Sequence, residues 1–118
     1  MNKRKIGSRK EELAASYIEA HGGRVIDRNY RSRMGEIDLI ANDDGTTCFI
    51  EVKYRSDIRK GYPAEAVDGR KQFTICRTSD HYRMKKGLSE DIPYRFDVIS
   101  IVGSEITWYK NAFQYIGL

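Results

Sequence analysis

Residues 35–55 read GEIDLIANDDGTTCFIEVKYR, two runs of alternating apolar and polar residues joined by a short polar turn. The alternation predicts two strands, because successive side chains along a strand point to opposite faces. Asp44-Gly45 is typical of a two-residue type I′ turn and predicts that the strands form a hairpin. With this turn, Asp38 lies directly opposite Glu51.

This facing pair of acids is the unusual feature of the hairpin. Counted outward from the turn, Asp38 and Glu51 fall at a non-hydrogen-bonded pair, where the Cβ atoms lie about 4.5–5.5 Å apart. Like charges directly opposite each other destabilise a sheet, so we expect a cation to compensate the pair. A three-residue loop would shift the register by one and place Asp38 opposite Ile50, so the prediction depends on an even loop.

Two facing carboxylates favour a site for Mg²⁺ or Mn²⁺, which prefer oxygen ligands. The backbone carbonyl of Val52 is a candidate third ligand. Lys53 shares a face with Glu51, where its ammonium could hold an attacking water or offset charge on a phosphate. An Asp followed by Glu-x-Lys on the next strand is the layout of a metal-dependent phosphodiester hydrolase. The alternative, an ordinary amphipathic hairpin whose polar face meets water, stays open at this point.

The segments GEIDLIA and FIEVKYR resemble the YraN-type family of small bacterial proteins. That family is similar to the restriction-endonuclease-like superfamily, and particularly to archaeal Holliday junction resolvases. The resemblance extends over nearly the whole chain, through Gly7, Glu11, Ala14, Tyr17, Arg28-Asn29, Glu65-Ala66-Val67, Lys71 and Arg95-Phe96-Asp97-Val98.

The resemblance implies a nuclease-type core in which Asp38 and Glu51 are metal ligands and Lys53 is catalytic. In the resolvase-like branch a helix carboxylate joins the site, and Glu11 is the matching position. Lys10 departs from the family pattern, which often has glycine directly before that glutamate. The resemblance to resolvases also implies a homodimer.

The composition is compatible with one cytoplasmic domain. We expect residues 1–118 to form a single domain in which the basic residues 1–8 are a mobile arm. A net charge of +4 and a pI of about 9.1 are compatible with binding to nucleic acid or to an anionic surface. Two cysteines are too few for a disulfide framework and indicate buried thiols in a reducing cytosol. No apolar run is long enough to span a membrane, and no signal-peptide pattern opens the chain.

Periodicity predicts the other elements. Residues 9–21 have apolar residues at helical spacing, with Ser8 as a candidate N-cap and Glu11 as its capping-box partner. Glu11 therefore has two competing roles, in a helix cap and at the site. Elsewhere we expect a strand over 24–28, a helix from Pro63 or Ala64 to Lys85-Lys86-Gly87, strands over 94–102 and 106–109, and a short helix in the tail. This order predicts an α/β fold, a restriction-endonuclease-like mixed central sheet flanked by helices.

Basic residues near the acidic pair are candidate contacts to a nucleic-acid backbone. They are Arg28, Arg31, Arg33, Arg55 and Lys71. Each of them could equally be a solvated side chain. The loop 56–63 is a candidate lid over a substrate. Asp97 is expected to pair with Arg95, and Trp108 to serve in packing.

The leading hypothesis is a divalent-metal-dependent endonuclease that cleaves DNA, including branched or structured forms. The alternative is a non-catalytic nucleic-acid-binding module that uses the same basic residues. A third hypothesis is a protein-interaction domain whose acidic pair has no function. The sequence has no Ser-centred elbow, glycine-rich phosphate loop or HExxH motif, and its two histidines share no ligand spacing with the cysteines.

Overall fold

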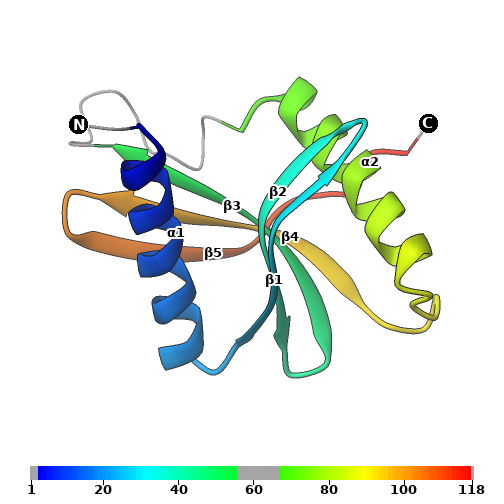
Figure 1. Cartoon of the computed structure of the whole chain (residues 1–118). Helices are drawn as coiled ribbons and strands as arrows, with labels where there is room; N and C mark the ends of the chain where they lie inside the picture. The colour runs from blue at the N-terminus through cyan, green and yellow to red at the C-terminus, as the bar shows by residue number, and fades with distance from the viewer. Residues whose placement is uncertain (1–2, 56–66, 118) are drawn as a thin grey trace.

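In the part of the chain that the structure describes, two helices and five strands make up the fold, shown as a computed structural model in Figure 1. The structure describes residues 3–55 and 67–117, and within these the side chains from residue 9 onward. In chain order the elements are α1 (Lys3–Ala20), β1 (Arg24–Ser32), β2 (Gly35–Asp43), β3 (Thr46–Arg55), α2 (Gly69–Lys85), β4 (Tyr94–Val102) and β5 (Glu105–Phe113). The predicted order of helix, three strands, helix and two strands is confirmed.

The strands form one mixed sheet in the order β1-β2-β3-β4-β5. β3 and β4 pair in parallel, whereas the other neighbours are antiparallel. α2 lies between β3 and β4 in the chain and so makes the crossover that parallel neighbours require. The predicted α/β sheet flanked by helices is confirmed, and it is consistent with a restriction-endonuclease-like fold. Neither helix in the described part of the chain is long and apolar enough to cross a membrane.

The β2–β3 hairpin has the register predicted from its turn. Asp44-Gly45 has positive φ angles of 51° and 88°, as a type I′ turn requires. Pairing begins at this turn and continues outward to Leu39 and Ile50. The even loop is therefore confirmed. The two acids are the next residues in the same register, although the paired ladder ends just before them.

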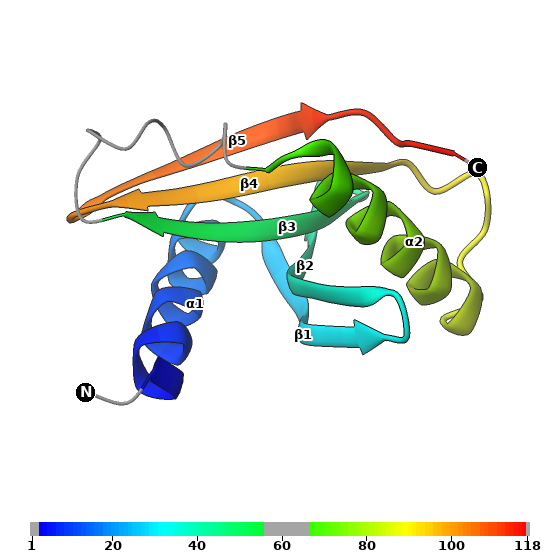
Figure 2. The ribbon, with the colours of Figure 1, turned by 90° about the horizontal axis from the view of Figure 1, so that it is seen from above.

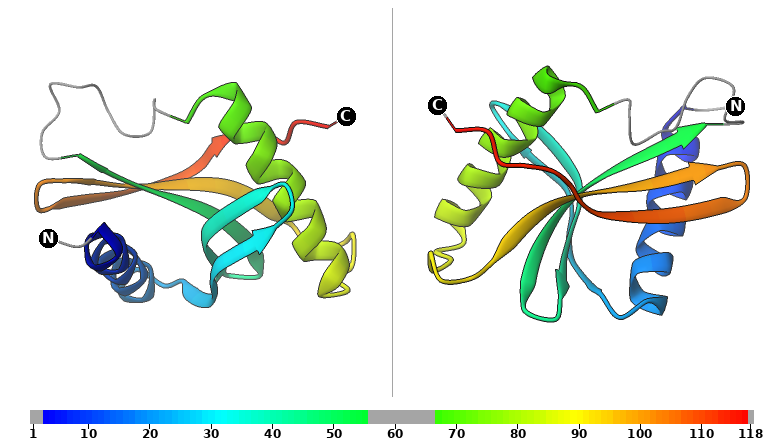
Figure 3. Two further views of the ribbon diagram at one scale, coloured as in Figure 1. Left: turned by 45° about the horizontal axis from the view of Figure 1, so that its top comes forward. Right: turned by 180° about the vertical axis from the view of Figure 1, so that it is seen from behind.

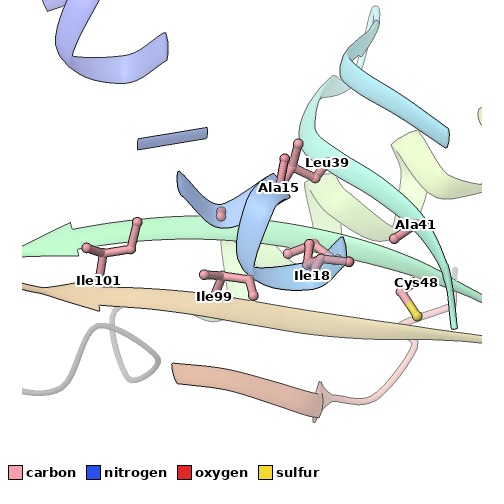
Figure 4. Packing of buried hydrophobic residues seen from close by; sticks show 9 residues of the cluster. Ala15, Ile18, Leu39, Ala41, Cys48, Ile99 and Ile101 are labelled. Carbon is pink, nitrogen blue, oxygen red and sulfur yellow. The ribbon is translucent and has the colours of Figure 1, made fainter. Parts of the chain in front are cut away.

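A hydrophobic core lies on each face of the sheet. Figure 4 shows the cluster under α1, which consists of Ala14, Ala15, Ile18, Leu39, Ala41, Cys48, Ile50, Ile99 and Ile101. The cluster under α2 consists of Ile37, Ile40, Phe49, Val67, Ile75, Cys76, Tyr82, Phe96 and Val98. Both cysteines are buried free thiols, as predicted.

Burial of a large apolar side chain contributes about 1.5–3 kcal/mol, so these clusters hold the two helices on the sheet. Both views of Figure 3 show α1 and α2 well apart, with strands between them. Neighbouring β3 residues such as Phe49 and Ile50 belong to different clusters, which is the alternation expected of a strand covered on both faces.

α1 begins earlier than the sequence predicts. The helix starts at Lys3, so residues 3–8 of the expected basic arm belong to α1. Ser8 lies inside the helix and is not its N-cap, which makes the predicted capping box with Glu11 wrong as well. Gly7 does not end the helix, because one glycine in a helix interior costs only about 1 kcal/mol.

Other boundaries also differ from those predicted. α2 begins at Gly69, whereas the expected starts at Pro63 and Ala64 lie outside the described residues, as does the candidate lid over 56–63. β1 continues to Ser32, beyond the predicted end at Arg28, because it pairs with β2 along its length. β5 extends to Phe113, and residues 114–117 form no helix.

Asp97 joins β4 to β5. Its buried carboxylate accepts hydrogen bonds from Arg95 Nε (3.0 Å), from Trp108 Nε1 (2.9 Å) and from the Asn111 backbone N–H (2.8 Å). The predicted pairing of Asp97 with Arg95 is confirmed. Trp108 packs against the cluster under α1, also as predicted. Because structural groups satisfy its oxygens, Asp97 is a structural acid.

Gly35 lies where β2 passes close to α2. A Cβ atom at this position would be 2.2 Å from Thr74 Cγ2. Gly35→Ala is therefore expected to lower the free energy of unfolding by about 1–3 kcal/mol, as overpacking does, measured by urea unfolding. Thr74→Ser removes only the opposing methyl group, so the double variant should regain most of the loss. Equal losses in the single and double variants would contradict this account.

Candidate active site

The candidate site lies where β2 separates from β3. Beyond Leu39 and Ile50 the two strands no longer pair, and Figure 2 shows the β1–β2 hairpin bending away from β3. Asp38 is the first β2 residue beyond the last pair, and Glu51 is its counterpart on β3. We call this place, defined by Asp38, Glu51 and Val52, the fork.

The Asp38 carboxylate replaces a backbone carbonyl of β2 as the acceptor of the next hydrogen bond from β3. Its Oδ2 accepts a hydrogen bond of 2.8 Å from the Val52 backbone N–H. In the register of the hairpin that N–H would face Ile37, which instead packs in the cluster under α2. This bond holds the Asp38 side chain between the diverging strands, beside Glu51.

Glu51 is the buried acid of the fork. Only 6% of its side chain is exposed, and Nζ atoms of Lys53 and Lys71 lie 3.5 and 3.6 Å from its Oε1. Lys53 follows Glu51 by two residues on β3, which places both side chains on one face, as the sequence predicts. Lys71 reaches the same oxygen from the first turn of α2. The two ammonium groups offset the cost of burying the carboxylate.

The pKa of Asp38 lies well above that of an ordinary aspartate. Its pKa is raised from 3.8 to about 7, chiefly by burial and next by the charge of Glu51. The Val52 N–H and the Lys71 ammonium oppose this rise in pKa, and the Glu11 carboxylate adds to it. Glu11 therefore acts on Asp38 through its charge. A carboxyl group whose pKa is raised by burial and by a neighbouring carboxylate is typical of functional sites.

The N-terminus of α2 brings Lys71 to the fork. Asp68 is the N-cap of the helix, and its Oδ1 accepts a hydrogen bond of 2.9 Å from the Lys71 backbone N–H. Lys71 is one of the predicted phosphate contacts, but the sequence does not place it beside Glu51. An Asp before a helical run is an N-cap signal, and that signal could have placed Lys71 in the first turn of the helix.

Two of the predicted nucleic-acid contacts lie on the edge strand β1. Arg28 forms an ion pair of 2.7 Å with Glu12, and Arg31 forms one of 3.5 Å with Glu36. The Arg31 side chain is 78% exposed, so its pairing is weak and its guanidinium can reach a phosphate. Neither arginine is brought to the two acids of the fork.

The other two predicted arginines lie at strand ends. Arg33 is exposed in the turn between β1 and β2. Arg55 is the last residue of β3, and its carbonyl accepts a hydrogen bond from the Gly103 N–H. Within residues 9–55 and 67–117, no ion pair joins these arginines to the fork acids. Among the described residues, Lys53 and Lys71 are thus the cations brought to Glu51.

Comparison with known sequences places this arrangement in a family. The pattern of the uncharacterised protein family UPF0102 matches residues 10–101, a stretch that includes the fork. The chain belongs to this family. A UPF0102 protein of Lachnoclostridium phytofermentans is 44% identical over 117 residues, with 99% of each chain covered. UPF0102 proteins of Persephonella marina and Vibrio parahaemolyticus are each 41% identical, covering 92% and 94% of this chain and 92% and 93% of their own. The predicted relation to the YraN-type family, which is UPF0102, is confirmed.

The donor set of the fork fits a small divalent cation that the protein holds through few atoms. Mg²⁺ usually binds one or two carboxylates and keeps several waters, and Asp38 and Glu51 supply two. A cation bound there would stabilise the ionised form of Asp38, whose pKa is raised by burial and by Glu51. No group of three His, Cys, Asp or Glu side chains that could hold a metal ion occurs in the described part of this UPF0102 chain. Glu11 therefore does not complete a three-carboxylate cage.

Proposed function

We propose that this protein is a divalent-metal-dependent endonuclease that cleaves phosphodiester bonds of DNA. The observation that supports the proposal most is the fork itself. The charge of Glu51 raises the pKa of Asp38, and Lys53 lies 3.5 Å from Glu51. Two oxygen ligands beside a lysine are the groups that metal-assisted phosphodiester hydrolysis uses.

The residues of the fork, and Lys53 and Glu11 near it, each have a proposed role. Asp38 and Glu51 would hold Mg²⁺ or Mn²⁺, which when bound supplies Lewis-acid stabilisation of phosphate charge and a more acidic water. The Val52 carbonyl is a candidate third oxygen, because the N–H and C=O of a strand residue point to the same side and this N–H faces Asp38. Lys53 orients the attacking water or stabilises charge that develops on the phosphate. Glu11 is an auxiliary carboxylate that acts through its charge.

DNA is the proposed substrate because the chain is basic and carries exposed arginines. The chain has a net charge of +4, and Arg31 on β1 and Arg33 in the β1–β2 turn are exposed and available for phosphate contacts. The resemblance to archaeal Holliday junction resolvases extends the proposal to branched DNA and to a homodimer. The two buried free thiols are compatible with a protein of the reducing cytoplasm.

A cleavage assay on linear, nicked, flapped and four-way DNA tests the proposal. Products should appear with Mg²⁺ or Mn²⁺ and disappear in EDTA, and four-way junctions are the substrate expected to be cut fastest. DNA binding without cleavage, unchanged in Asp38→Asn, would instead support the non-catalytic nucleic-acid-binding module. Absence of both binding and cleavage at moderate salt would contradict both functions.

Mn²⁺ is expected to raise the melting temperature of the protein. An ion present at about 100 times its Kd stabilises the native state by about 2.7 kcal/mol. Asp38→Asn should remove most of this gain, because it removes one of the two carboxylate ligands. Glu90→Gln, at an exposed position between α2 and β4, is the matched control and should keep the gain. An equal gain in Asp38→Asn would mean that the ion binds elsewhere.

A further inference from the structure

Two lysines share one oxygen of Glu51. Nζ of Lys53 and Nζ of Lys71 lie 3.5 and 3.6 Å from Oε1. These distances exceed the roughly 2.7–2.9 Å of a direct charge-assisted hydrogen bond. Both ammonium groups are therefore attracted by the buried charge, and neither is locked onto it.

Lys71 is the more loosely held of the two. Its side chain is 42% exposed, against 30% for Lys53. The backbone of Lys71 is fixed by Asp68 at the start of α2, but its long stem can swing between Glu51 and solvent without moving the helix. Lys53 instead projects from β3, the central strand of the sheet.

The charges at the fork make Lys71 a group that a divalent cation would displace. Its ammonium lies 3.6 Å from Oε1 of Glu51, so it neutralises a candidate ligand. A doubly charged ion on the same oxygens would repel a nearby ammonium and replace it in neutralising Glu51.

We propose that Lys71 is a positioning residue that neutralises Glu51 in the metal-free protein and turns to a phosphate of the nucleic acid when a divalent ion binds. The inference rests on the proposed function and adds regulation of the same site. Lys71 competes with the ion for Glu51, so it weakens metal binding in the absence of DNA. After displacement it lies at the N-terminus of α2, where the helix dipole also favours an anion, and supplies one phosphate contact beside the fork.

The first test measures metal affinity without DNA. Lys71→Met keeps an apolar stem and removes the competing charge, so the Kd for Mn²⁺ should fall by roughly two- to fivefold, as expected for a partly exposed ion pair. Lys71→Arg keeps the charge and should stay near the wild-type Kd. Lys85→Met, at an exposed position in the last turn of the same helix, is the matched control and should change nothing. An unchanged or higher Kd in Lys71→Met would overturn the proposal.

The second test measures how DNA binding depends on salt, both without a divalent ion and with Ca²⁺, which prefers oxygen ligands. One phosphate contact on duplex DNA changes the slope of log K against log salt by about 0.9. Wild type and Lys71→Met should have equal slopes without the ion and differ by about one contact with it. A merely structural role for Lys71 would produce the same difference under both conditions, and that result would overturn the proposal.

Different results would contradict the proposed function and the proposed role of Lys71. If wild type and Lys71→Met both fail to bind Mn²⁺, the proposed function fails and the role of Lys71 falls with it. If wild type binds Mn²⁺ and Asp38→Asn does not, the fork holds the ion. Unchanged Kd and salt dependence in Lys71→Met would then overturn the role of Lys71 alone.

Discussion

Lys53→Met is expected to slow DNA cleavage by about 10²–10³-fold while leaving the fold intact. A preorganised group that stabilises charge appearing only in the transition state contributes about this much to a rate. The Lys53 ammonium is 3.5 Å from Glu51 Oε1, and its side chain is 30% exposed. It can therefore reach a phosphate that enters from solvent while it stays next to the ligand carboxylate. Met approximates the lysine stem without its charge, so the substitution isolates the contribution of that charge.

Single-turnover cleavage at saturating protein measures this effect, because it separates chemistry from binding. Lys85→Met is the control variant and should cleave at the wild-type rate. A Lys53→Met protein with weaker DNA binding but an unchanged rate at saturation would show that Lys53 binds the substrate without stabilising the transition state.

Asp38→Asn is expected to stabilise the metal-free protein near pH 8 by up to about 4 kcal/mol, and to change its stability little near pH 4. The pKa of Asp38 is about 7 in the folded protein, raised by burial and by Glu51, against about 3.9 in the unfolded chain. The folded state therefore binds the proton more tightly. The stability that Asp38 contributes is fully present below about pH 4 and is lost as the pH rises through about 7. Asn does not titrate, and its side-chain oxygen can still accept the Val52 N–H.

Urea unfolding of both proteins in EDTA, across this pH range, measures the difference in stability. Asp91→Asn, exposed in the loop before β4, is the control and should show no such trend. A stability difference between Asp38→Asn and wild type that stays constant with pH would show that Asp38 is not buried beside a second charge. If the same variant both gains stability and loses Mn²⁺ binding, the acid is retained for function at the expense of stability.

The hairpin could be predicted in detail because its register is decided locally. Asp44-Gly45 accepts positive φ at both positions, and this turn fixes which residues of the two strands face each other. The relation of Asp38 to Glu51 follows from that register, and the position of Lys53 follows from the alternation of side chains along β3. These inferences need no information about the rest of the fold.

The divergence of the strands at the fork could not be predicted from the sequence. Alternation predicts a ladder that continues past Leu39, whereas Ile37 packs in the cluster under α2, and Gly35 approaches Thr74 on that helix. These contacts join residues far apart in the chain, so the local sequence pattern does not predict them. For the same reason, Lys71 could be predicted as a cation near the site but not as a partner of Glu51.

The boundaries of α1 and β1 were missed for a related reason. Ser8 has the chemistry of an N-cap and the predicted strand ends at Arg28, yet the helix starts at Lys3 and the strand continues to Ser32. Polar residues fit within both elements, because a helix on the outside of a sheet and an edge strand each keep a side in water. Pairing of β1 with β2 then extends the strand beyond what its own residues favour.

The bond from the Val52 N–H to Asp38 Oδ2 makes one backbone amide a spectroscopic marker of the acid. A hydrogen bond to an ionised acceptor is shorter and stronger than one to a neutral acceptor. The amide resonance of Val52 in an NMR spectrum will therefore shift when Asp38 gains a proton or a ligand. A single peak can thus follow proton and ion uptake in the unmodified protein, without a dye or a substrate.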